Sequence, residues 1–230
     1  MKYVGSKNRL AKHILPIILE RRTTETYVEP FAGGMNLIQH VSGDRIANDL
    51  NPYIVAMFKA LVEDDWIPPS DLSEQQYHRV KEHPELFPDE YVGFVAVGCS
   101  YGGKWWGGFA RGKTKEGKPR NYCLESKNNI LKQKEKLKGV DFYSVDYSSL
   151  CFPSNSIVYC DIPYKGTVKY KDKFDHNKFW DWAKELSKHQ TVYVSEYSAP
   201  EYVECVWSKP VTVSIDSHKT KKTTEKLYKL

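Results

Sequence analysis

The chain has 230 residues, of which 40% are hydrophobic and 13% aromatic, a composition that is typical of folded globular proteins and excludes a largely disordered chain. No stretch approaches the roughly 20 apolar residues that cross a bilayer, and the residues after Met1 lack the apolar run of a secretion signal. We therefore expect a soluble cytoplasmic protein, and the length fits one catalytic domain with a subdomain. The net charge is +5.

The cysteines are odd in number and far apart in the sequence. They form no C-x-x-C pair, and no histidine lies beside them at a spacing suited to a metal ligand. We therefore expect neither a structural zinc site nor a disulfide framework, and no metal cofactor. The expected state is that of buried free thiols at Cys99, Cys123, Cys151, Cys160 and Cys205.

The first part of the chain predicts a helix, a strand and a glycine turn. Apolar residues recur at helical spacing over residues 8–22. A short strand at 26–28 then runs into Glu29-Pro30-Phe31-Ala32-Gly33-Gly34, and a helix-compatible stretch follows. The order strand, glycine turn, helix is the opening of a nucleotide-binding α/β unit, although a turn of this kind is as often merely structural.

An acidic residue follows the next predicted strand. Residues 45–48 form this strand, Asp49 ends it, and a helix begins after Asn51-Pro52. An acid at this distance from the glycine turn is where such folds hydrogen-bond the two hydroxyls of a ribose. The alternative is that Asp49 caps the helix that follows.

The pattern changes over residues 66–138, which contain several prolines, a stretch rich in glycine and tryptophan at 102–108, and a basic run. Residues 101–140 hold eleven Lys and Arg against three acids, a local charge of +8 that leaves −3 for the rest of the chain. This distribution favours a surface that binds a polyanion, with a solvated helix face as the alternative. We predict a subdomain at 66–138, inserted into a catalytic domain of residues 1–65 and 139–230.

Strands and a helix alternate again after the insertion. Apolar runs predict strands at 140–145, 156–160 and 191–195, with a helix at about 175–188 between the last two. Residues 211–215 and 226–230 resemble a closing antiparallel pair. The predicted fold class is therefore α/β with a mostly parallel sheet.

The sharpest chemical signal is Asp161-Ile162-Pro163-Tyr164, directly after an apolar strand. The Asp161 carboxylate and the Ile162 carbonyl can each accept one N–H of an exocyclic amino group, while Tyr164 can stack on a base. The alternative is a proline turn in which Asp161 caps a helix.

Together these segments resemble the Dam-type family of DNA adenine-N6 methyltransferases, whose motifs run in the same order. The similar segments are residues 3–7, 29–34, 47–49, 161–164, 195–197 and 214–230. Ile162 departs from the family, which usually has proline at this position of its catalytic tetrad. Since the position contributes a main-chain carbonyl, isoleucine supplies the same acceptor, without the fixed φ of proline.

The resemblance implies a Rossmann-like S-adenosylmethionine-dependent methyltransferase sheet with an inserted, mainly helical target-recognition subdomain. It implies cofactor contact by Tyr3, Lys7, Phe31, Gly33, Asp49 and Asp161, and handling of a flipped adenine by Asp161, Ile162, Pro163 and Tyr164. The substrate would be double-stranded DNA in a bacterial or phage-infected cell, within or outside a restriction-modification system. We expect a monomer, or a dimer on DNA.

In the insertion, the candidates for DNA contact are Lys104, Trp105, Arg111, Lys113 and Arg120. We expect at least one of Trp105 and Trp106 to lie in the core of the subdomain. Two alternatives to the main hypothesis stay open: a methyltransferase of cytosine N4 or of an RNA base, and a DNA-binding homologue that has lost turnover through Ile162.

Overall fold

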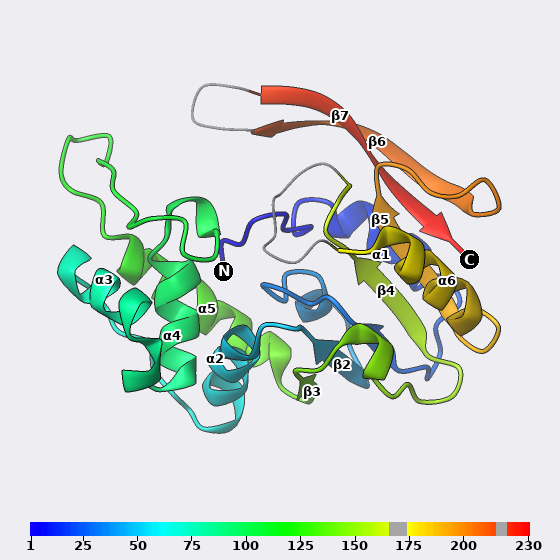
Figure 1. Cartoon of the computed structure of the whole chain (residues 1–230), viewed down its shortest axis with the longest axis horizontal. Helices are drawn as coiled ribbons and strands as arrows, with labels where there is room; N and C mark the ends of the chain where they lie inside the picture. Colours follow the sequence, from blue (N-terminus) through cyan, green and yellow to red (C-terminus); the bar gives the residue numbers. More distant parts are fainter. Residues whose placement is uncertain (166–173, 215–219) are drawn as a thin grey trace.

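The computed structural model describes residues 1–165, 174–214 and 220–230. Within them, seven strands form one sheet in the order β3-β2-β1-β4-β5-β7-β6 (Figure 1). Neighbouring strands from β3 to β5 are parallel, whereas β7 is antiparallel to both β5 and β6. The strands are β1 (Tyr27–Glu29), β2 (Arg45–Asn48), β3 (Val140–Tyr143), β4 (Ile157–Asp161), β5 (Thr191–Glu196), β6 (Glu204–Ser214) and β7 (Thr220–Lys229).

The two faces of the sheet are buried in separate apolar cores. Tyr27 of β1 and Tyr159 of β4 belong to the core that also contains α1 (Ala11–Ile18). Their neighbours Val28 and Val158 belong to the core under α6 (His176–Leu186). Strands buried on both faces read as continuous apolar runs, which explains why β4 was predictable. The predicted α/β fold class is confirmed.

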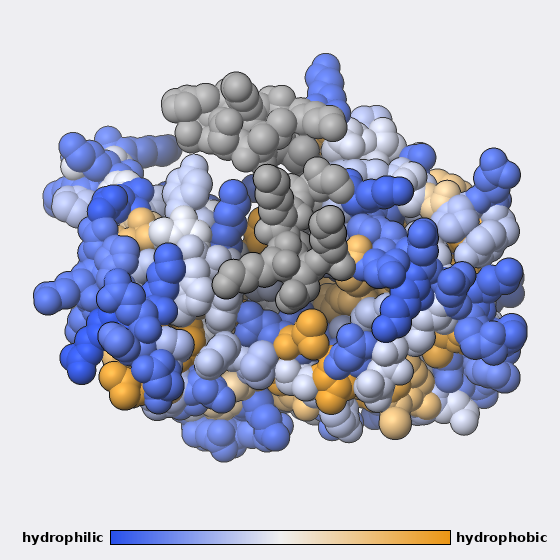
Figure 2. Space-filling view, viewed as in Figure 1, coloured by the Kyte–Doolittle hydropathy of each residue, from blue (hydrophilic) through white to orange (hydrophobic). Residues whose placement is uncertain are grey.

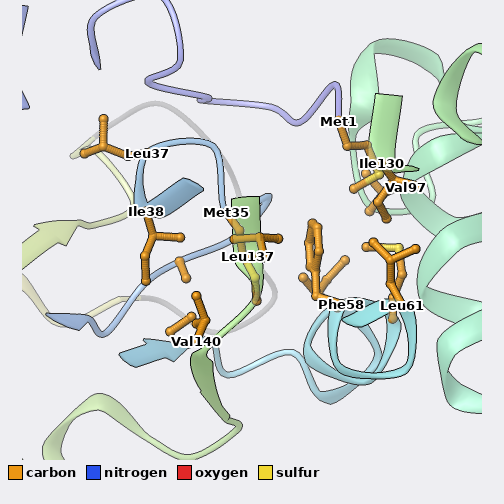
Figure 3. Packing of buried hydrophobic residues seen from close by; sticks show 14 of the residues in the cluster. Met1, Met35, Leu37, Ile38, Phe58, Leu61, Val97, Ile130, Leu137 and Val140 are labelled. Carbon is orange, nitrogen blue, oxygen red and sulfur yellow. The ribbon is translucent and has the colours of Figure 1, made fainter. Parts of the chain in front are cut away.

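The remaining helices gather at one end of the molecule (Figure 1). They are α2 (Pro52–Glu63), α3 (Glu74–Glu82), α4 (Asp89–Gly98) and α5 (Tyr122–Leu137). Figure 3 shows Phe58 and Leu61 of α2 packed near Val97 of α4 and Ile130 of α5. Short 3₁₀ helices occur at Ile38–His40, Pro84–Leu86, Tyr101–Gly103 and Tyr147–Ser149. Residues 66–138 are thus mainly helical where the sequence predicts an insertion, and α2 joins their core to that of the sheet.

Gly93 allows α4 to approach α2 closely. A Cβ added at Gly93 would lie 2.1 Å from the carbonyl oxygen of Tyr53. Alanine is the better helix former by about 1 kcal/mol, but a contact this short forces the two helices apart. We expect Gly93→Ala to lower the free energy of unfolding by about 1–3 kcal/mol in urea titrations. Gln75→Ala, on the exposed side of α3, is the control, and equal stability of the two variants would contradict this packing.

Two sequence predictions are wrong in the described residues. The stretch after the glycine turn forms turns and the 3₁₀ helix Ile38–His40 instead of an α-helix, because Gly33 and Met35 adopt positive φ angles of 47° and 52°. All five cysteines are free, but Cys151 and Cys205 are exposed, since they lie in a loop and on the outermost strand.

Other predicted elements differ only in length. The first helix is shorter than residues 8–22, and the closing pair is longer than predicted, with β6 and β7 paired from Glu204 to Lys229. Residue 215, at the predicted end of one strand, and the lysine-rich turn after it lie partly outside the described residues. Among the helices of the described part, none is long and apolar enough to cross a membrane.

Candidate active site

Four carboxylates mark the edge of the sheet where the parallel strands end. Glu29 ends β1, Asp161 ends β4 and Glu196 ends β5, while Asp49 directly follows β2. From β1 the chain proceeds to β2 and β3 on one side, whereas β4 and β5 lie on the other. In open α/β sheets, ligands bind outside the carboxyl ends of the strands at such a switch point.

Asp49 is bonded to the glycine turn. Its Oδ2 accepts the Gly33 N–H at 2.8 Å, and its Oδ1 accepts the Asn51 N–H at 3.0 Å. Burial raises the pKa of Asp49, and these two N–H donors oppose the rise. Helix α2 is capped by Asn51, whose side chain accepts from the Tyr53 N–H at 3.1 Å. Capping of α2 therefore does not account for Asp49.

The ring of Tyr3 lies on the glycine turn. A Cβ added at Gly33 would lie 2.8 Å from Tyr3 Cε1, and one at Gly34 would lie 2.6 Å from Tyr3 Cβ. The Asn36 amide nitrogen, 2.7 Å from that second position, is buried and has no hydrogen-bond partner among the described residues. The structure thus brings Tyr3, Gly33 and Asp49 together beside a buried donor.

Lys7 and Asp161 form an ion pair in which the lysine is buried and the Asp161 side chain is 24% exposed. The Lys7 Nζ lies 2.9 Å from Asp161 Oδ1, and the Lys7 side chain is 7% exposed. The same ammonium donates to the Gly5 carbonyl at 3.2 Å and lies 4.5 Å from the centre of the Tyr164 ring. Burial lowers the pKa of Lys7, but the charges of Asp161 and Glu225 outweigh it and raise the pKa overall. Lys7 is therefore a permanent cation beside the tetrad.

Burial also raises the pKa of Asp161, against the pull of Lys7 and with a further rise from the charge of Glu225. The Lys7 ammonium, 2.9 Å away, favours the charged form of this carboxyl. Because the Asp161 side chain is 24% exposed, its carboxylate oxygens remain accessible to a ligand.

The isoleucine of the tetrad is anchored by packing. Ile162 is 2% exposed and belongs to the core under α6. Next to it, the Pro163 carbonyl oxygen lies 3.0 Å from His176 Nε2. Burial of the Ile162 side chain fixes the loop where a second proline ring would have fixed φ. The substitution therefore leaves an ordered main chain at the tetrad.

Tyr164 is held on several sides. Its hydroxyl donates to Glu225 Oε2 at 2.6 Å, and its ring meets the Tyr197 ring edge to face, with centres 4.5 Å apart at 84°. Lys7 lies over the ring, as described above. Burial is the main cause that raises the pKa of Tyr164 well above its usual value, so the hydroxyl stays protonated.

Sequence reasoning assigned no role to Glu196, Glu225 or His176. Glu196 is 1% exposed, and it accepts the Lys165 N–H at 3.1 Å and the Tyr197 N–H at 2.7 Å. His176 Nε2 lies 3.5 Å from the same carboxylate. An acid that ends an apolar strand was a usable signal for Glu196, as it was for Asp161. Nothing local in the sequence pointed to Glu225 or His176.

Phe31 makes its contacts in the core under α6, whereas the loop just before Lys104 contacts the N-terminal segment, since the Val4 N–H donates to the Gly103 carbonyl at 3.1 Å. Phe31 packs against Tyr147 and Phe179, with ring centres 5.1 and 5.8 Å apart, in the core under α6. Trp105 is 37% exposed and stacks on Tyr53 of α2, with ring centres 5.8 Å apart.

Trp106 packs against the larger core, with its ring 5.4 Å from that of Tyr77. The expectation that one of the two tryptophans belongs to the core is confirmed for Trp106.

The basic candidates of the insertion differ in their partners. Arg111 pairs with Glu74, and Arg120 pairs with Glu125. Lys104 and Lys113 are exposed, and hydrophilic residues dominate the surface on the side of α3 and α4 in Figure 2. The two lysines are therefore the more available cations. Within the described ranges, no three His, Cys, Asp or Glu residues are grouped so as to hold a metal ion.

Comparison with known proteins relates this chain to methyltransferases. Residues 3–97 match the model of the D12 class of N6 adenine-specific DNA methyltransferases, which confirms the resemblance predicted from the motifs. The matched range contains Tyr3, Lys7, Gly33 and Asp49 and ends before Asp161.

Two solved structures are similar in fold. The rRNA methyltransferase aviRa from Streptomyces viridochromogenes is 12% identical, with 99% of this chain and 86% of that chain covered and a TM-score of 0.46. The tRNA (m1A58) methyltransferase TrmI from Aquifex aeolicus is 10% identical, with 98% and 75% covered and a TM-score of 0.40.

Proposed function

Because residues 3–97 match a family of adenine-specific DNA methyltransferases, we propose that this chain transfers a methyl group from S-adenosylmethionine to the N6 amino group of a flipped adenine in DNA. The observation that carries the proposal is the partly exposed Asp161 carboxylate, which is paired with the buried Lys7 and lies at the switch point of the sheet beside Ile162, Pro163 and Tyr164. A carboxylate, a main-chain carbonyl and an aromatic ring are the groups that an exocyclic amine on a flat base requires.

The residues around the glycine turn suit S-adenosylmethionine. Asp49 offers carboxylate oxygens for the ribose hydroxyls, and Gly33 keeps the main chain open beside Tyr3. The unpaired Asn36 amide is a donor that a ligand oxygen would satisfy. Lys7 is a cation that suits the methionine carboxylate of the cofactor, and Phe31 remains a proposed contact from the resemblance alone. The cofactor supplies a methyl group on a sulfonium, which is a strong electrophile.

In the proposed reaction, Asp161 and the Ile162 carbonyl each accept one N–H of the adenine amino group. The nitrogen lone pair is delocalised into the ring, so two acceptors that favour a tetrahedral nitrogen, together with orientation, supply much of the acceleration. The amino nitrogen would attack the methyl carbon directly, with the electrons of the carbon–sulfur bond going to the departing sulfur, and the methylated nitrogen, which is strongly acidic, would then release one proton to water. No covalent intermediate with the protein is needed.

Lys7 now occupies the position of a donor to Asp161, over the face of Tyr164. In the proposed complex the adenine N–H replaces that ammonium, and Lys7 is released toward the carboxylate of the cofactor. The buried Lys7 ammonium would therefore have a carboxylate as its partner in both states, which avoids an unpaired buried charge.

The insertion supplies the proposed contacts to the DNA backbone. We expect Lys104→Ala and Lys113→Ala each to weaken binding to duplex DNA a few-fold, irrespective of sequence, because an exposed lysine neutralises one phosphate. The slope of log K against log salt concentration should become shallower by about 0.9 per lysine in fluorescence-anisotropy titrations. The control is Lys188→Ala, at an exposed position just after α6, the helix at the other end of the molecule from α3 and α4. An unchanged slope in both insertion variants would show that these lysines do not contact the DNA.

Long-read sequencing of DNA from an expression host without adenine methylation tests the proposed function. We expect N6-methyladenine at one short recurrent site, and none in cells that express the Asp161→Ala variant. N4-methylcytosine in its place would support the first alternative. Unmodified DNA, together with purified protein that binds DNA but transfers no methyl group to DNA or RNA, would support the inactive homologue.

A further inference from the structure

The hairpin of β6 and β7 extends beyond the carboxyl end of the neighbouring strand β5. Strand β7 pairs with β5 only from Tyr193↔Lys229 to Glu196↔Lys226. Glu225 is therefore the first residue of β7 past the carboxyl end of β5. From this point the hairpin extends toward the end of the molecule that holds α3 and α4 (Figure 1). Glu225 thus lies where the hairpin passes the switch-point edge of the sheet.

Glu225 is buried, although it belongs to a projecting hairpin. The residue is 8% exposed, and its Oε2 accepts the hydroxyl proton of Tyr164 at 2.6 Å. Burying a carboxylate is costly unless hydrogen bonds compensate for its lost hydration. The Tyr164 hydroxyl is one such donor, and the charge of Glu225 also acts on Lys7 and Asp161. Glu225 therefore belongs with Lys7 and Asp161 to one group of interacting charges in the site.

The contact with Glu225 acts at the hydroxyl end of the Tyr164 ring. Lys7 lies over one face of the ring and Tyr197 meets it at 84°, whereas the contact with Glu225 is made by the hydroxyl. A hydrogen bond from the hydroxyl to a carboxylate is short, directional and about twice as strong as one between neutral groups. It holds the plane of the ring relative to β7.

We propose that Glu225 is a positioning residue of the methyl-transfer site, which holds the Tyr164 hydroxyl so that the ring is ready to stack on the target base. The inference rests on the function proposed above. It also connects the hairpin to Tyr164, so that the placement of β7 contributes to the geometry of base stacking through the hydrogen bond between Tyr164 and Glu225.

The variants Glu225→Ala and Glu225→Gln, each with and without Tyr164→Phe, test this role. Glu225→Ala removes the acceptor, so we expect kcat to fall about 10–100-fold while the KM for S-adenosylmethionine changes less than about 3-fold. Glu225→Gln keeps an acceptor of the same shape and should restore most of kcat. With Tyr164→Phe already present, Glu225→Ala should have almost no further effect, because both partners of the hydrogen bond are then absent. Glu204→Ala, an exposed acid on the same hairpin, is the matched control.

Equal loss of kcat in the Ala and Gln variants would overturn the proposal. So would a full effect of Glu225→Ala in the Tyr164→Phe background, since the residue would then act by another route. A duplex with 2-aminopurine at the target position gives a second readout: reduced fluorescence enhancement with Glu225→Ala supports a role in base stacking, and unchanged enhancement contradicts it.

One further measurement separates this proposal from the proposed function. In protein labelled with ¹³C at Cζ of tyrosine, the Tyr164 resonance, assigned by its loss in Tyr164→Phe, should move in Glu225→Ala and return toward its place in Glu225→Gln. A resonance that stays in place overturns the contact itself. A wild-type protein that is inert on DNA overturns the proposed function, whatever the resonance does.

Discussion

Replacing Asp161 by asparagine is expected to lower kcat for methyl transfer about 10²–10³-fold, which is the usual effect of removing one preorganised electrostatic contact to the reacting group. Asparagine keeps one oxygen acceptor in nearly the same shape but loses the negative charge. The developing positive charge on the amino nitrogen is then no longer stabilised by the carboxylate at the switch point.

The same change affects Lys7. With Asp161 neutral, the ammonium loses the partner that now lies 2.9 Å away, while burial continues to lower its pKa. We therefore expect a loss of thermal stability in addition to the loss of turnover, and both are measured on the same preparation. Circular dichroism decides whether the variant is folded under the conditions of the assay.

Asp181→Asn is the matched control, because Asp181 is exposed on α6 and undergoes the same chemical change. It should keep the kcat of the wild type. An Asp161→Asn variant that is folded and turns over within about 3-fold of the wild type would contradict the role of this carboxylate.

Stability should fall as the pH rises because of Glu29. Burial raises the pKa of this carboxyl to about 8, with the charge of Asp161 adding to the rise and the Tyr27 hydroxyl, which donates at 2.9 Å, opposing it. Its ordinary value is 4.5. Between about pH 4.5 and pH 8, the folded protein thus keeps a proton on Glu29 that the unfolded chain has already released.

The direction of the pH dependence of stability follows from the difference between these two pKa values. The stabilisation linked to Glu29 is fully present below about pH 4.5 and is lost as the pH rises to about 8, at up to about 1.4 kcal/mol per pH unit. Glu29→Gln cannot ionise, and its amide oxygen still accepts from Tyr27. We therefore expect the variant to gain on the order of 2–4 kcal/mol relative to the wild type between pH 5 and pH 9.

Urea titrations at pH 5, 7 and 9 measure this difference. Glu201→Gln, at an exposed position, should follow the wild type at every pH and serves as the control. Parallel curves for Glu29→Gln and the wild type would show that Glu29 is already ionised in the folded protein.

The elements that sequence reasoning predicted well are those with a strong local pattern. The apolar run of β4 followed by Asp161, and the strand β2 followed by Asp49, identified two of the carboxylates at the switch point. Their meeting at one edge follows from parallel pairing, which the alternation of strands and helices had implied. Local pattern failed after the glycine turn, where the positive φ of Met35 ends any helix.

The contacts that sequence reasoning missed are between residues far apart in the chain. Tyr164 and Glu225 meet only because β7 returns antiparallel to β5. Arg111 meets Glu74 across the insertion, so one of the proposed DNA-binding cations already has a partner. Composition reports the sum of the charges, but it does not report which of them are paired.

Mass spectrometry of nucleosides is the most direct test of methyl transfer to adenine N6 in DNA. Purified protein is incubated with unmethylated duplex DNA and S-adenosylmethionine that carries a deuterated methyl group, and the DNA is digested to nucleosides. We expect deuterium-labelled N6-methyldeoxyadenosine with the wild type and a loss of that product with Asp161→Asn. Labelled N4-methyldeoxycytidine, or a labelled nucleoside only when RNA replaces DNA, would contradict the account.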